Sequence, residues 1–171
     1  DCTEGATTTA PVNAGIYYVK ATTAAFGNYT AGLSDPAILT ISKKEMTVTV
    51  EVDKTYDGSA LVTDYSQFVT DDFVSGDEFI GGKMNTTSKD VKVYRDIGYD
   101  WTFIDAVKTD KGIGNYEVTW EVSLEISVAE IKVTPDSGKT KVYGGSDPEF
   151  TYTYTGEISE ETAKFTGALS R

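Results

Sequence analysis

The chain has 171 residues, with 27 acidic and 15 basic side chains, a formal net charge of −12, no histidine and a single cysteine, Cys2. This negative field repels phosphate groups, which excludes nucleic acid as an expected partner and disfavours anionic membrane surfaces. Without histidine the common nucleophilic triads cannot form, so we expect no enzyme activity, no catalytic residue, no cofactor and no resident metal.

Three segments alternate between apolar and polar residues with a period of two, which is typical of strands with one buried face. They run from Met46 to Val52, from Tyr116 to Val128 and from Phe150 to Tyr154. The second run is long for one strand, so we expect a bulge, a bend or two successive strands there. No run of roughly 18 apolar residues is present, so no membrane insertion is expected. Short strands without a long amphipathic helix predict an all-β fold, namely a β-sandwich with Greek-key connections.

Glycine-containing clusters separate these runs and predict turns. The clusters are Asp57-Gly58, Ser75-Gly76-Asp77, Gly81-Gly82 and Asp136-Ser137-Gly138. The only helical signal is Ser159–Lys164, where Ser159 is a suitable N-cap and two acids follow it. We expect one or two helical turns there.

Two short motifs recur at the same spacing. Gly27-Asn28-Tyr29 returns as Gly114-Asn115-Tyr116, and Lys54-Thr55-Tyr56-Asp57-Gly58 is followed by the similar Lys141-Val142-Tyr143-Gly144-Gly145. Both recurrences fall 87 positions apart. This spacing is too long for a solenoid unit and predicts tandem domains of about 86 residues.

The phase of the repeat divides the chain into three segments. Residues 1–42 form the C-terminal half of one Ig-like repeat, residues 43–128 form a complete repeat, and residues 129–171 form the N-terminal half of a third. No Pro-rich or Gly-rich linker separates them, so we expect stiff connections. Each half-repeat would lack the strands that cover its apolar face. The two halves would complete each other either by closing within one chain or by head-to-tail strand exchange between chains, and we favour the exchange.

The motifs resemble a known family of bacterial repeats. Pro11-Val12-Asn13-Ala14-Gly15-Ile16-Tyr17 is similar to the closing segment of the Ig-like MBG and YDG repeats of large surface adhesins, and Lys54–Gly58 resembles the opening of the YDG type. Lys141–Pro148 and Thr166–Arg171 resemble the opening and middle of the MBG type. No Asn-Ala-Gly segment is visible before Gly114 in the complete repeat.

The resemblance implies a secreted or wall-attached protein of a bacterial cell surface and implies no catalysis. We therefore expect a non-enzymatic stalk or adhesion module that spaces or presents a binding region. The partners would be neighbouring repeats, host glycans or matrix proteins. Glycines precede Tyr17 and Tyr29 and follow Tyr56 and Tyr143. We expect these tyrosines to be structural, with hydroxyls that bond backbone carbonyls at sandwich corners, and ligand contact is the alternative.

The alternative is a module that binds carbohydrate or host matrix directly. Two features of the sequence are suited to such a binding module. Tyr99, Trp101 and Phe103 share one face of an expected strand and would stack on sugar rings if exposed, although burial of Trp101 and of Trp120 in the core is the default expectation. The acidic loop Asp71–Glu78 would offer oxygen ligands to calcium, or is simply a solvated turn.

Overall fold

The computed structural model describes residues 8–158, 161–167 and 169, and the chain is β throughout this part. Its only helical elements are two 3₁₀ turns, η1 (Tyr65–Gln67) and η2 (Ile113–Asn115). Among the described residues no helix is long and apolar enough to cross a membrane. The all-β prediction is therefore confirmed.

Contacts divide the chain into two compact units. Unit 1 contains Asp1–Val50, Asp64–Lys83 and Ile104–Glu121, and unit 2 contains Glu51–Thr63, Met84–Phe103 and Val122–Arg171. The long strands contribute residues to both units.

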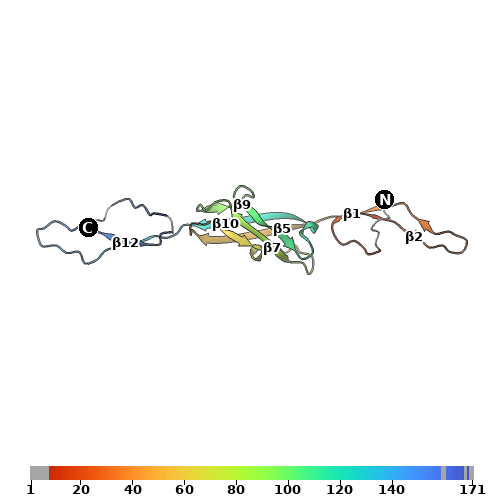
Figure 1. The fold of residues 1–171 in the computed structure, drawn as a ribbon, viewed down its shortest axis with the longest axis horizontal. Helices are drawn as coiled ribbons and strands as arrows, with labels where there is room; N and C mark the ends of the chain where they lie inside the picture. The colour runs from red at the N-terminus through yellow and green to blue at the C-terminus, as the bar shows by residue number, and fades with distance from the viewer. Residues whose placement is uncertain (1–7, 159–160, 168, 170–171) are drawn as a thin grey trace. The chain divides into compact units, whose positions relative to one another are not determined.

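Two three-stranded sheets form the β-sandwich (Figure 1). One has the order β5-β10-β8, with β5 (Lys44–Thr55), β10 (Tyr116–Ser127) and β8 (Lys92–Tyr94). The other has the order β6-β7-β9, with β6 (Val62–Asp64), β7 (Phe79–Thr86) and β9 (Trp101–Thr109). Strands β10 and β8 are antiparallel and place Leu124 opposite Tyr94.

The buried residues follow the alternation of the sequence. In unit 1 the core contains Met46, Val48, Val50, Phe68 and Tyr116, and in unit 2 it contains Leu61, Met84, Tyr94, Trp101, Val122, Leu124 and Ile126. Both predicted inward rows, on β5 and on β10, are thus confirmed. Strand β10 runs as one element of 12 residues, which excludes two successive strands, one of the three alternatives expected there.

The N-terminal segment, within unit 1, forms two small antiparallel pairs. Strand β1 (Gly15–Val19) pairs with β4 (Ala37–Ile41), and β2 (Thr22–Thr23) pairs with β3 (Gly32–Leu33). A tight turn joins β2 to β3, because Phe26 and Tyr29 exchange both backbone hydrogen bonds and Gly27 has a φ of 56°. The C-terminal segment, within unit 2, has one antiparallel pair, β11 (Lys132–Pro135) with β12 (Tyr152–Thr155).

One local prediction is wrong, and another falls partly outside the described residues. Gly81-Gly82 lies inside strand β7 instead of forming a turn, because Gly82 is buried where a side chain has no room. Residues 161–164 of the expected helix are not helical, and Ser159 and Glu160 lie outside the described residues.

Candidate functional site

The acidic loop Asp71–Glu78 is organised around Asp77, whose side chain is only 8% exposed. Its carboxylate accepts hydrogen bonds from the Tyr116 hydroxyl at 2.7 Å, the Lys111 amide at 2.8 Å and its neighbour Glu78's amide at 3.0 Å. Burial raises the pKa of Asp77, but these hydrogen bonds outweigh it and the net pKa is lowered. Asp77 therefore acts as a structural anchor that holds the loop against the end of β10.

A second acid of the loop has a similar structural role. The Asp72 carboxylate accepts the backbone N–H of Thr47 at 2.8 Å, and the Asp72 carbonyl accepts a hydrogen bond from Lys44. No group of three acidic, cysteine or histidine side chains is placed to hold a metal in the part of the chain that the structure describes. Asp72 and Asp77 therefore both make structural contacts in this loop.

The aromatic strip expected at residues 99–103 is not an exposed platform. Trp101 is 1% exposed, donates its indole N–H to the Arg95 carbonyl at 2.9 Å and packs edge-on against Phe103. Tyr99 is 86% exposed, but it lies in the turn before β9, so it does not share a strand face with the other two. The default expectation of a buried Trp101 is confirmed. Trp120 is half-buried against Phe68 at 5.3 Å.

Tyr17 and Tyr94 form matching tyrosine corners, in which the hydroxyl donates to a backbone carbonyl. The corner at Tyr94 was not predicted from the sequence. Tyr17 on β1 donates its hydroxyl to the carbonyl of Asn13, four residues earlier, at 2.8 Å. Tyr94 on β8 donates to the carbonyl of Asp90, also four residues earlier, at 2.6 Å. The segment Asp90–Tyr94 thus makes the same tyrosine–carbonyl contact as Asn13–Tyr17, although it lacks the Asn-Ala-Gly sequence.

The two corners share a strand partner as well as a hydrogen bond. Tyr17 lies opposite Leu39, as Tyr94 lies opposite Leu124. The second corner could have been found from the number of residues between a tyrosine and the closing strand that follows it. It was missed because this spacing is longer after Tyr94 than after Tyr17. Tyr143, by contrast, is fully exposed, which does not support the structural role expected for it.

In unit 1, Asn115 of η2 connects the N-terminal segment to β10. Its side-chain oxygen accepts the backbone N–H of Ala14 at 2.8 Å, and its amide nitrogen donates to the Asn13 side chain at 3.1 Å and the Lys111 carbonyl at 2.7 Å. A hollow of about 560 Å³ lies beside these contacts. Its lining consists of Val12, Asn13, Ala14, Ile41, Ser42, Lys44, Val74, Lys111, Asn115 and Tyr116.

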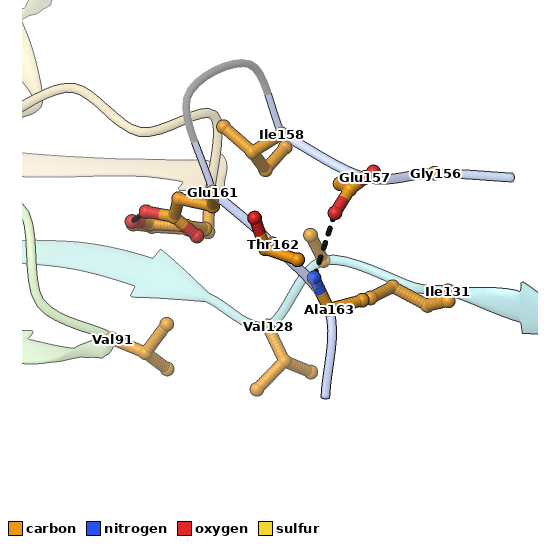
Figure 2. Close-up of a pocket in the computed structure, with 11 residues that line it drawn as sticks. Val91, Val128, Ile131, Gly156, Glu157, Ile158, Glu161, Thr162 and Ala163 are labelled. Carbon is orange, nitrogen blue, oxygen red and sulfur yellow. Dashed lines mark hydrogen bonds between the residues drawn. The ribbon is translucent and has the colours of Figure 1, made fainter. Parts of the chain in front are cut away.

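In unit 2, a corresponding hollow lies where β10 leads into β11 (Figure 2). Its volume is about 240 Å³, which is below the usual range for small-molecule sites of roughly 300–1,000 Å³. Figure 2 shows Val91 and Val128 below the loop that carries Ile158, Glu161 and Thr162. The Glu157 carboxylate closes this loop by accepting the Ala163 amide at 2.7 Å.

A cluster of polar side chains holds the same loop in place. Tyr56 donates its hydroxyl to Glu161, and Lys89 forms an ion pair with Glu161 at 3.3 Å while its ammonium lies 5.9 Å from the centre of the Tyr56 ring. The Tyr56 hydrogen bond, with a contribution from Lys89, lowers the pKa of Glu161, and the same carboxylate raises the pKa of Tyr56. The three side chains pair with one another and so hold this loop in place.

The two hollows occupy matching places in the sequence pattern. Ala14 and Val91 each stand three residues before the corner tyrosine of their segment. Each lines one of the hollows. The same hollow is also lined by residues that connect one long strand to the next, from Ile41–Lys44 in unit 1 and from Val128–Ile131 in unit 2. The candidate functional feature of this chain is therefore this recurring junction, a hollow beside the connection from one strand to the next.

Replacing Asn115 with alanine tests the junction in unit 1. The change removes the acceptor of the Ala14 amide, a hydrogen bond that stabilises by about 1 kcal/mol, so we expect hydrogen exchange at Ala14 to accelerate about fivefold. The measurement is amide hydrogen exchange by NMR. Asn28, the matching residue in the exposed β2–β3 turn, is the control, and N28A should leave Ala14 unchanged. Equal acceleration in both variants would contradict the assignment.

The C-terminal segment matches a known family. Residues 131–171 match the MBG domain (YGX type), in agreement with the resemblance seen at Lys141–Pro148. No curated protein and no solved structure shows significant similarity to the chain.

Proposed function

We propose that this chain is a non-enzymatic stalk or adhesion module of a bacterial cell-surface protein, and that it spaces or presents a binding region outside the cell. The MBG match at residues 131–171 supports a surface-protein module. The observation that carries the proposal is that polar side chains at the two hollows are paired with other groups of the protein. Asn115 is engaged with Asn13 and Ala14, and Glu161 with Tyr56 and Lys89.

This use of polar groups is suited to a spacer. A ligand site needs polar atoms that converge on a space and remain unpaired until the ligand arrives. Asn115 at one junction and Glu161 at the other are paired within the protein, and aliphatic side chains contribute to the lining of both hollows. Direct connections held in this way transmit force and keep neighbouring repeats in a fixed relation, which a stalk requires.

A second candidate, direct binding of carbohydrate or host matrix, is favoured by one observation. Phe26 and Tyr29 are paired across the tip of the β2–β3 turn and are 82% and 79% exposed. Two exposed aromatic rings on one turn form a surface on which a sugar ring can stack. This pair, and not the residues around Trp101, is the place where such a function would reside.

Binding of the purified chain to glycans, mucin and matrix proteins, with and without calcium, distinguishes the two candidates. The stalk proposal expects no saturable binding to any of them. Saturable binding that is lost in a Phe26→Ala/Tyr29→Ala variant, but retained in Tyr143→Ala, would overturn it in favour of the binding module. Tyr143 is a suitable control because its side chain is fully exposed elsewhere in the chain.

A further inference from the structure

The turn at residues 54–60, which carries the Lys-Thr-Tyr-Asp-Gly motif, is held in shape by its own side chains. We call it the Tyr-Asp-Gly turn. The Asp57 carboxylate accepts hydrogen bonds from the Lys54 ammonium at 2.6 Å and from the Ser59 hydroxyl and amide at 2.7 and 3.0 Å. The same groups hold the pKa of Asp57 well below its ordinary value. This network fixes the turn from within the motif and the two residues that follow it.

The remaining two residues of the Tyr-Asp-Gly sequence face a distant part of the chain. Tyr56 donates its hydroxyl to Glu161, 105 positions away, and not to a backbone carbonyl as the sequence led us to expect. Gly58 has a φ of 85°, and a Cβ on it would lie 2.9 Å from the Ile158 side chain. Both residues of the motif therefore contact the same loop of the C-terminal segment.

That loop, residues 156–163, is also closed by its own hydrogen bonds. The Ala163 amide donates to the Glu157 carboxylate at 2.7 Å, and the Glu161 amide donates to the Ile158 carbonyl at 3.1 Å. Figure 2 shows Ile158 and Glu161 on the loop. The loop thus offers an aliphatic side chain and a carboxylate, and the turn offers them a residue without a Cβ and a hydroxyl donor.

A loop of the same kind occurs in unit 1. Residues 157–164 stand 86 positions after residues 71–78, and an edge-on pair of aromatic rings flanks each loop. The pairs are Phe68 with Phe79 at 5.5 Å and Tyr154 with Phe165 at 5.0 Å. In unit 1, Val74 of the loop lines a hollow together with Val12 and Ala14. In both units, therefore, the loop borders a surface formed by the preceding part of the chain.

We propose that the Tyr-Asp-Gly turn is a recognition surface for the MBG-type segment that follows it, and that the loop at residues 156–163 is the part it recognises. Tyr56 selects a carboxylate at the position of Glu161, and Gly58 admits an aliphatic side chain at the position of Ile158. The family match at residues 131–171 includes this loop, so the partner is a neighbouring domain of the same protein. The inference does not depend on the proposed stalk function, because a binding module also needs its domains held together.

A double-mutant cycle in the full chain tests the polar half of the contact. Tyr56→Phe removes the donor, and Glu161→Ala removes the acceptor. Each should accelerate hydrogen exchange at the Ala163 amide, which closes the loop, by about threefold or more. Because the two changes break the same hydrogen bond, adding Tyr56→Phe to Glu161→Ala should have no further effect. Multiplied effects, or no acceleration in either single variant, would overturn the proposal.

A second cycle tests the steric half of the contact. Gly58→Ala introduces the strain of a side chain at positive φ and also a collision with Ile158, whereas Ile158→Ala removes the collision and leaves the strain. Gly58→Ala should therefore accelerate exchange at Ala163 at least about fivefold in the parent chain, but less than about twofold when Ile158→Ala is already present. Equal acceleration in both backgrounds would mean that Gly58 serves the turn alone, and would reject recognition of the loop.

Two controls separate docking of the loop from general stability. Tyr143→Phe changes the matching tyrosine of the second motif, which is fully exposed, and should leave exchange at Ala163 unchanged. The amide of Leu124, a residue that is 0% exposed in β10, reports on the fold and should exchange within about twofold of the parent rate in Tyr56→Phe. Acceleration in Tyr143→Phe, or equal acceleration at Leu124 and Ala163 in Tyr56→Phe, would overturn the proposal. These measurements involve no external ligand, so their failure is distinct from failure of the stalk proposal.

Discussion

Replacing Asp77 with alanine is expected to lower the free energy of unfolding by about 3 kcal/mol, because the change leaves several buried donors without an acceptor. The Tyr116 hydroxyl and the backbone amide of Lys111 both donate to this carboxylate at 2.8 Å or less. Tyr116 is itself 3% exposed, so water cannot replace the lost partner without opening the end of β10. Urea unfolding followed by tryptophan fluorescence measures the loss.

Asp71 provides the matched control, since it belongs to the same loop and is exposed. Asp71→Ala should change stability by no more than about 0.5 kcal/mol, as is usual for surface positions. Addition of calcium should not raise the stability of the parent chain. Equal losses in the two variants, or marked stabilisation by calcium, would mean that the loop is an ion site and that Asp77 is not its anchor.

The pH dependence of stability follows from the same group. The pKa of Asp77 is lowered in the folded chain from its ordinary value of 3.8. A carboxyl group with a depressed folded-state pKa contributes stability that is fully present above its unfolded pKa and is lost as the pH falls through the folded value. Asp77→Asn should therefore show a shallower loss of stability than the parent between pH 5 and pH 2, measured by thermal unfolding. Parallel pH profiles would contradict the lowered pKa.

The strands could be predicted from the sequence because their signal is local. Alternation of apolar and polar residues along β5 and β10 identifies the buried face without knowledge of what covers it. Burial of Trp101 could be anticipated for the same reason. The match at residues 131–171 likewise rests on short motifs with fixed spacing.

Contacts between distant segments could not be predicted in this way. Asp77 looks like any other acid of its loop, and its role depends on Tyr116, 39 positions away. The Asp90–Tyr94 corner was missed because its residues differ from the Asn-Ala-Gly pattern while its hydrogen bond is the same. A backbone carbonyl accepts a tyrosine hydroxyl whatever side chain it carries, so the geometry persists where the sequence motif does not.

The Gly81-Gly82 pair shows why a composition rule for turns failed. Glycine is common in turns because it tolerates positive φ, and Gly82 does have a φ of 135°, but it is in the middle of β7. A Cβ on Gly82 would meet the Phe68 ring at 3.0 Å and the Val107 backbone at 3.2 Å. The residue is glycine because a neighbouring ring and a neighbouring strand approach the backbone closely.

Gly82→Ala is accordingly expected to destabilise the chain by about 3 kcal/mol, from the strain of a side chain at positive φ together with overpacking against Phe68. Gly81→Ala is the control: its Cβ would meet only the Lys108 side chain, at 3.7 Å, an ordinary contact. That variant should differ from the parent by less than about 1 kcal/mol. Thermal unfolding of the Gly82→Ala and Gly81→Ala variants measures the difference. If the two glycines were a flexible turn, both substitutions would be tolerated equally, whereas a close approach inside a strand penalises Gly82 alone.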